Sequence, residues 1–132
     1  MISRTILLFD GSAYEALDLS AAIEARGCCV AGPVDSLPEA EAIVASAPVS
    51  GAIVDGELAD ASAVVMLLAD KQVPFVIQTS TPLPAPLAEL NGTATVLARP
   101  IDPSRILDRL LVRMVNPNAW PAIKLGCRPK QV

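Results

Sequence analysis

The chain has 132 residues, the usual length of a single domain, and 52% of them are hydrophobic, so a sizeable core can form. The net charge of −4, with scattered basic residues, disfavours nucleic acid as a partner, and the absence of histidine excludes Cys/His zinc sites and serine-histidine triads. No apolar run approaches the roughly 18 to 20 residues of a membrane span, and the start MISRTILLFDGS lacks a signal-peptide core, so we expect a cytoplasmic protein without membrane contact.

Apolar runs alternate with helix start signals along the first half of the chain. Ser12 with Glu15, and Ser36 with Glu39, have the spacing of capping boxes, in which two side chains satisfy backbone N–H groups at a helix start. The expected elements in this half are a strand at 4–9, a helix from Ser12 to about Arg26, a strand at 28–32, a helix from Ser36 to about Ala47, and a strand at 51–55.

The second half continues the alternation, with more prolines. Pro82, Pro84 and Pro86 limit any helix between two of its strands to a short one. Asp102 as N-cap and Pro103 at the first helical position predict the start of the last helix. The expected elements are a helix at 61–71, a strand at 74–79, a short helix at 85–90, a strand at 94–98, and a helix from 104 to about 114.

This order predicts a doubly wound α/β domain with a parallel sheet, because apolar strands without period-two alternation need helices on both faces. We assign the domain to residues 1–114 and treat residues 115–132 as a C-terminal tail with no independent domain. Trp120 in this tail is expected to anchor against its own domain or against a second copy.

Four residues able to bind a cation or a phosphoryl group fall at the carboxyl ends of expected strands, where open α/β sheets bind ligands: Asp10, Asp55, Thr79 and Arg99. Carboxylates hold hard cations such as Mg²⁺, while a hydroxyl and a cation can take phosphoryl oxygens. The set predicts a metal and phosphoryl site at one edge of the sheet.

The segments ILLFDGS, GPVDSLPEAEAIV, AIVDGEL, PFVIQTS and TVLARPIDPSRILDRLL resemble the receiver domain of bacterial two-component response regulators. The resemblance covers residues 4 to about 113. It implies a flavodoxin-like fold, a five-stranded parallel sheet of order 2-1-3-4-5 with helices on both faces.

The resemblance also implies roles for individual residues. Asp55 stands at the phosphoacceptor position, Asp10 at that of a metal-binding acid, and Glu57 where a backbone carbonyl completes the Mg²⁺ shell. Thr79 occupies the position of the hydroxyl that bonds the phosphoryl group. Pro100 matches a proline that often follows a cis peptide.

Three positions depart from the family pattern. Phe9 stands where the family has a second acid, Arg99 replaces a lysine, and Val96 stands where many members have an aromatic residue. With Asp10 and Asp55 as the only acids beside Arg99, the pocket is less negative than usual, so we expect weak Mg²⁺ binding. Arg99 could also pair permanently with Asp55 and hold the site in one state.

Three functions remain open at this point. The first is a non-enzymatic receiver that takes a phosphoryl group from a histidine kinase or phosphotransferase onto Asp55 and signals by protein contact. The second is a degenerate receiver that binds proteins without phosphorylation. The third, a small flavin-binding protein, is disfavoured because no phosphate-binding loop follows the first strand. The downstream partner is expected on the face from the fourth to the fifth helical segment, and a homodimer is a further expectation.

Overall fold

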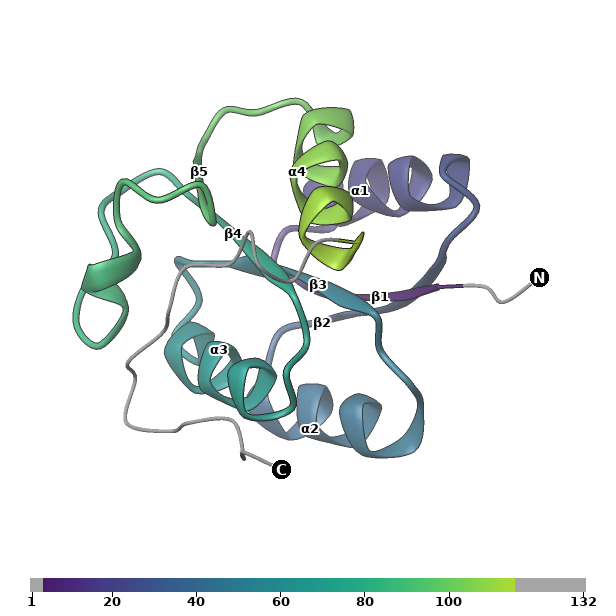
Figure 1. Ribbon diagram of the computed structural model, residues 1–132, viewed down its shortest axis with the longest axis horizontal. Coiled ribbons are helices and arrows are strands. Elements are labelled where there is room, and N and C mark those ends of the chain that lie inside the picture. The colour runs from purple at the N-terminus through teal and green to yellow at the C-terminus, as the bar shows by residue number, and fades with distance from the viewer. Residues whose placement is uncertain (1–3, 116–132) are drawn as a thin grey trace.

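The structure is a computed structural model, and it describes residues 4–115. Its strands are β1 (Thr5–Phe9), β2 (Cys29–Val34), β3 (Gly51–Asp55), β4 (Phe75–Thr79) and β5 (Val96–Ala98). Its helices are α1 (Ala13–Ala25), α2 (Leu37–Ser46), α3 (Ala61–Asp70), the 3-10 helix η1 (Leu87–Leu90) and α4 (Pro103–Val115). The alternation of strands and helices expected from the sequence is confirmed (Figure 1).

The strands form one parallel sheet in the order β2-β1-β3-β4-β5, as the family resemblance implied. The register brings the strand ends level, because Asp55 of β3 lies beside Gln78 of β4, and Thr79 lies beside Ala98 of β5. The polar residues at these ends therefore share one edge of the sheet.

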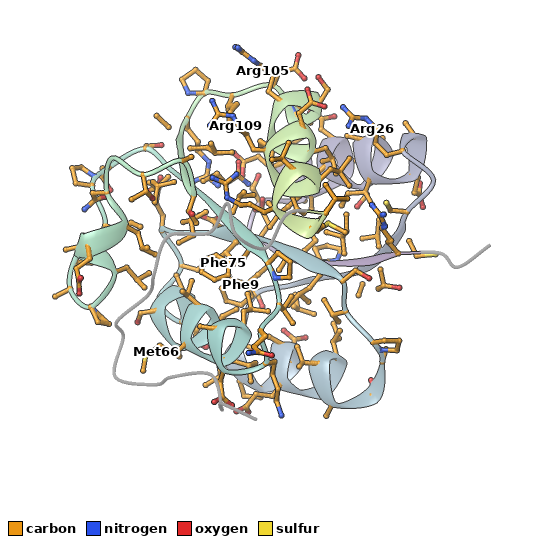
Figure 2. All side chains as sticks on the ribbon, in the orientation of Figure 1. Phe9, Arg26, Met66, Phe75, Arg105 and Arg109 are labelled. Atoms are coloured by element: carbon orange, nitrogen blue, oxygen red, sulfur yellow. The ribbon has the colours of Figure 1, made fainter. Side chains whose placement is uncertain are left out.

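Helices cover both faces of the sheet and bury two apolar clusters. Alternate residues of β1 point to opposite faces: Leu7 and Phe9 pack in the cluster beneath α2 and α3, whereas Ile6 and Leu8 pack beneath α1 and α4. Figure 1 shows the two helical layers on either side of the sheet. Phe9 of β1 and Phe75 of β4, labelled in Figure 2, both belong to the cluster beneath α2 and α3 and are almost fully buried.

The short helix expected at 85–90 is present as the four-residue 3-10 helix η1, since Pro84 and Pro86 leave too few N–H donors for a longer one. Two other local expectations were wrong. At α2, the Ser36 side chain caps no backbone N–H; its hydroxyl donates to Glu39 Oε1 at 3.0 Å instead. Strand β2 also continues to Val34, two residues beyond its expected end.

The C-terminal boundary also shifts slightly. Val115, which we assigned to the tail, is the last residue of α4. The rest of the tail, including Trp120, lies outside the described residues. Within residues 4–115, no helix combines the length and the hydropathy needed to cross a bilayer.

Candidate functional site

The carboxyl edge of the sheet brings the predicted residues together. Asp10 follows β1, Asp55 ends β3, Thr79 ends β4 and Arg99 follows β5. The first three are buried, with exposed fractions of 4%, 7% and 5% respectively. The peptide bond between Arg99 and Pro100 is cis, as the resemblance implied.

Arg99 is held by three carboxylates from different parts of the chain. Its Nη1 lies 3.1 Å from Asp55 Oδ1 and 3.0 Å from Glu57 Oε2, and its Nη2 lies 2.7 Å from Glu15 Oε1. The Arg99 side chain is only 14% exposed. Burial alone would lower the pKa of Arg99, but the paired carboxylates of Asp55 and Glu15 raise it, so the guanidinium stays charged. The planar fork joins β5, β3 and α1 in one ion-pair cluster.

Glu15 is the site residue that the sequence analysis missed. Its backbone N–H donates to Ser12 Oγ at 3.3 Å, as a capping box requires. Its carboxylate, however, turns away from the helix start and binds Arg99. The N–H of Ser12 donates instead to Asp10 Oδ1 at 2.8 Å. Glu15 therefore brings an additional acid into the pocket from the first turn of α1, although Phe9 has replaced the acid expected on β1.

Asp10 is buried between hydrogen-bond donors and other acids. Gln78 Nε2 donates to its Oδ2 at 3.1 Å, and Ser12 N–H donates to its Oδ1. Burial raises the pKa of Asp10 to about 7; the Ser12 N–H opposes this effect, while the acids Glu15 and Asp55 reinforce it. Asp10 is thus partly protonated at neutral pH, which lowers the negative charge of the cluster.

Asp55 has one engaged and one free carboxylate oxygen. Its Oδ1 accepts from the Glu57 backbone N–H at 3.0 Å and from Arg99 Nη1 at 3.1 Å. Its Oδ2 takes no hydrogen bond from any residue between 4 and 115. One oxygen of this strand-end carboxylate therefore remains available for a metal or for covalent chemistry.

Glu57 and Thr79 make contacts that the sequence analysis did not predict. The Glu57 carboxylate accepts from the Ser80 backbone N–H and from Arg99, and the Ser80 contact above all lowers the pKa of Glu57. Thr79 Oγ1 donates to the Thr81 carbonyl at 2.8 Å and accepts its N–H at 3.3 Å. The Thr79 hydroxyl thus satisfies loop backbone in this state. The metal role of the Glu57 carbonyl and the phosphoryl role of Thr79 stay predictions.

The donor set fits a hard cation. Asp10, Glu15 and Asp55 each offer a carboxylate oxygen, and these oxygens lie within 4.8 Å of one another. Mg²⁺ prefers such oxygen ligands and completes its shell with water. Glu15 and Asp55 also bind Arg99, so a metal and the guanidinium share two carboxylates. The earlier charge count must be corrected, since Glu15 and Glu57 add two acids to the cluster.

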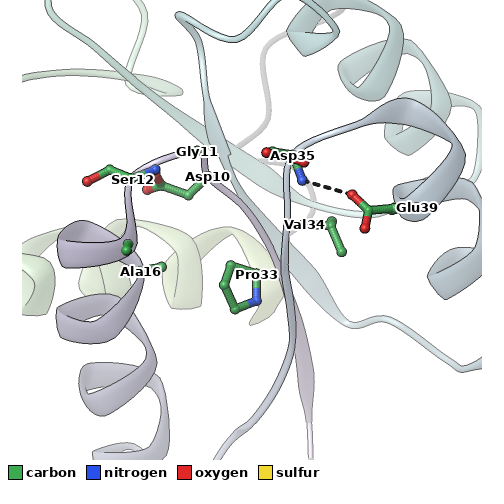
Figure 3. A pocket seen from close by; sticks show the side chains of 9 residues that line it. Asp10, Gly11, Ser12, Ala16, Pro33, Val34, Asp35 and Glu39 are labelled. Carbon is green, nitrogen blue, oxygen red and sulfur yellow. Dashed lines mark hydrogen bonds between the residues drawn. The ribbon is translucent and has the colours of Figure 1, made fainter.

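A pocket of ≈ 220 Å³ opens beside Asp10, between the loops that follow β1 and β2 (Figure 3). Its lining includes the acids Asp10, Asp35 and Glu39. The Asp35 backbone N–H donates to Glu39 Oε1 at 3.4 Å, which joins the loop to the first turn of α2 (Figure 3). Solvent and small molecules can therefore approach the Asp10 end of the cluster from this side.

Comparison with known proteins finds the same fold in solved structures. A response regulator receiver protein from Sinorhizobium medicae is 22% identical, with a TM-score of 0.72 over 86% of this chain and 96% of that one. SdrG from Sphingomonas melonis is 24% identical, with a TM-score of 0.66 over 83% and 97%. The chemotaxis response regulator CheY4 of Vibrio cholerae is 20% identical, with a TM-score of 0.69 over 86% and 99%.

No family model matches the sequence, and no curated protein matches it. The likeness therefore rests on the architecture: the strand order, the helices on both faces and the spans covered. On these grounds residues 4–115 have the fold of response regulator receiver domains.

Proposed function

We propose that this protein acts in two-component signal transduction as a receiver that accepts a phosphoryl group on Asp55 and signals by protein contact. The observation that carries the proposal is the free Oδ2 of Asp55 within a cluster of acids and one arginine. A strand-end carboxylate with one oxygen fixed and the other open is oriented for nucleophilic attack.

The chemistry follows from these positions. Oδ2 of Asp55 attacks the phosphorus of a phosphohistidine, the phosphorus–nitrogen bond breaks, and the imidazole leaves and takes a proton from solvent. These 132 residues contain no histidine, so the phosphohistidine lies outside them; the donor that we propose is a sensor histidine kinase or phosphotransferase. Arg99 already contacts Asp55 and can pair with the oxygens of the new phosphoryl group. When bound by Asp10, Glu15 and Asp55, Mg²⁺ would neutralise charge during the transfer.

The partner surface that we propose runs from η1 across β5 to α4. Thr79 and Arg99 both border it, so a change at Asp55 can be passed to it through their loops. A homodimer through the same surface is part of the proposal. We propose signalling by contact, without catalytic turnover of a substrate.

A second function, protein binding without phosphorylation, is favoured by the Arg99 cluster. Three carboxylates already pair with the guanidinium, so Arg99 is held in place without a metal or a phosphoryl group, although these three acids and one arginine leave a net negative charge. A receiver locked in this way would present one fixed surface to its partner.

Intact mass measurement separates these two functions. The protein is incubated with acetyl phosphate and Mg²⁺, beside Asp55→Asn and the matched control Asp35→Asn, an exposed aspartate outside the cluster. We expect one phosphoryl group on the wild type and on Asp35→Asn, and none on Asp55→Asn. A wild type without added mass would contradict phosphorylation. If Arg99→Lys then gained a phosphoryl group, Arg99 would be what blocks Asp55, and this result would support the second function.

A further inference from the structure

The exposed large apolar side chains of residues 4–115 gather on one helical layer. They are Tyr14 and Leu17 of α1, exposed by 86% and 72%, and Val112 and Val115 of α4, exposed by 52% and 65%. Both helices cover the same face of the sheet (Figure 1), whereas the described residues of the α2 and α3 layer include no such side chain. This layer therefore presents an apolar outer surface.

On α1 the apolar residues are accompanied by acids. Tyr14, Leu17 and Ala21 follow one another at helical spacing and are exposed, with Asp18 and Glu24 exposed beside them; we call these five residues the α1 face. Neither acid of the α1 face forms an ion pair with any residue between 4 and 115. The α1 face is thus apolar, acidic and without a partner among the described residues.

The C-terminal segment has the complementary chemistry. All 14 acidic residues of the chain precede position 116, whereas 116–132 contains three basic residues, Lys124, Arg128 and Lys130, and no acid. Trp120, Ile123 and Leu125 add apolar side chains between them. The exposed arginines of α4, Arg105 and Arg109 (Figure 2), would repel this segment, so charge favours α1 over α4.

We propose that the segment 116–132 of this chain docks on the α1 face, with Trp120 against Tyr14 and Leu17. The segment must cross about 8–10 Å between packed helices and about 13 Å along the sheet, because α4 ends near Gly51 at the amino end of β3 whereas α1 begins at the carboxyl edge. The diagonal of about 16 Å is within reach of the five residues that follow Val115, which extend by about 16–18 Å when fully stretched. The proposal does not depend on phosphorylation of Asp55.

The chain carries its own probes for this contact, since Tyr14 and Trp120 are its only tyrosine and its only tryptophan. Trp120 emission and its quenching by acrylamide are measured in the full chain, together with energy transfer from Tyr14. The variants are Leu17→Ser and Asp18→Lys on α1, with Glu41→Lys on α2 as matched control, because Glu41 is an exposed helical acid on the opposite layer. Circular dichroism checks that each variant is folded.

We expect Trp120 to be shielded in the wild type and in Glu41→Lys. Quenching should rise several-fold in Leu17→Ser, in Asp18→Lys and at high salt, where charge attraction is screened. Two results would overturn the proposal: a wild-type Trp120 as accessible as in the urea-unfolded chain, or shielding that both α1 variants leave intact. Shielding that disappears on dilution would assign the contact to a second copy and also contradict docking within one chain.

Discussion

Replacing Arg99 with alanine tests whether the ion-pair cluster stabilises the fold. Removing one partner of a buried pair costs about 3–5 kcal/mol, and this range applies to Asp55, whose side chain is only 10% exposed. Glu15 and Glu57 are 38% and 42% exposed, so water can hydrate both carboxylates. The pair with Glu15 contributes about 0–1 kcal/mol, and the pair with Glu57 is screened by solvent. The buried Nε of Arg99 has no partner among the described residues, and its removal offsets part of the loss.

We therefore expect Arg99→Ala to lower the free energy of unfolding by about 2–3 kcal/mol, which for a domain of this size lowers Tm by about 10 °C. The assay is thermal unfolding followed by circular dichroism, with EDTA present. Arg26→Ala is the matched control, because Arg26 (Figure 2) pairs with Asp108 at 2.9 Å but the two side chains are 30% and 66% exposed. Equal losses of Tm in the two variants would refute the reasoning.

The same pair of proteins tests competition between Arg99 and Mg²⁺. A ligand that binds only the folded state raises Tm in proportion to its affinity. Because Arg99 occupies Glu15 and Asp55, millimolar Mg²⁺ should raise the Tm of Arg99→Ala more than that of the wild type. An equal gain in both would show that the cation binds elsewhere or that Arg99 does not compete.

Three further predictions concern the buried neighbours of this cluster. The pKa of Asp10, 3.8 when unperturbed and about 7 in the fold, means that the folded state holds a proton that the unfolded chain loses between these values, so unfolding free energy falls as pH rises across this window. Asp10→Asn should therefore gain stability relative to wild type from pH 5 to pH 8 in EDTA, by at most about 3 kcal/mol; a constant difference would contradict this. Phe9→Asp should lower the free energy of unfolding, measured with urea, by more than the roughly 3–5 kcal/mol of a core truncation. The new carboxylate would not restore a metal ligand, because the Phe9 side chain is fully buried in the cluster beneath α2 and α3. Gly56→Ala should lose about 1–3 kcal/mol in the same assay, since its Cβ would lie 2.8 Å from both Ile77 Cγ2 and Leu83 Cδ2; wild-type stability would show that these side chains shift freely.

The fold was predictable because its signals are local. Short apolar runs, capping residues such as Ser12, and the Asp102–Pro103 start of α4 lie within a few residues of the elements that they specify. The short helix at 85–90 has the same origin, because the prolines indicated a short element, although they did not show that η1 would be a 3-10 helix. Strand order needed the family resemblance, since it depends on contacts between distant segments.

The contacts of Glu15 and Glu57 were not predictable in this way. Glu15 has the spacing of a capping box with Ser12, a partner three residues away, yet its carboxylate binds Arg99, 84 residues away. One signal was present in the sequence: an arginine in place of the family's lysine has more donors than Asp55 alone can satisfy. That surplus predicts additional acceptors nearby, although it cannot say which acids of the chain supply them.

The negative charge of the cluster can be reduced by a proton, by Arg99 or by a bound metal ion. A proton on Asp10 and the guanidinium of Arg99 are intrinsic to the folded chain, whereas a metal would have to share Glu15 and Asp55 with Arg99. A phosphoryl group on Asp55 would add negative charge where Arg99 already lies, and a guanidinium pairs more strongly with a phosphoryl group than with a half-exposed carboxylate. Under the proposed function, phosphorylation would therefore release Glu15, and the first turn of α1, beside Tyr14, would be the first part of the fold to respond.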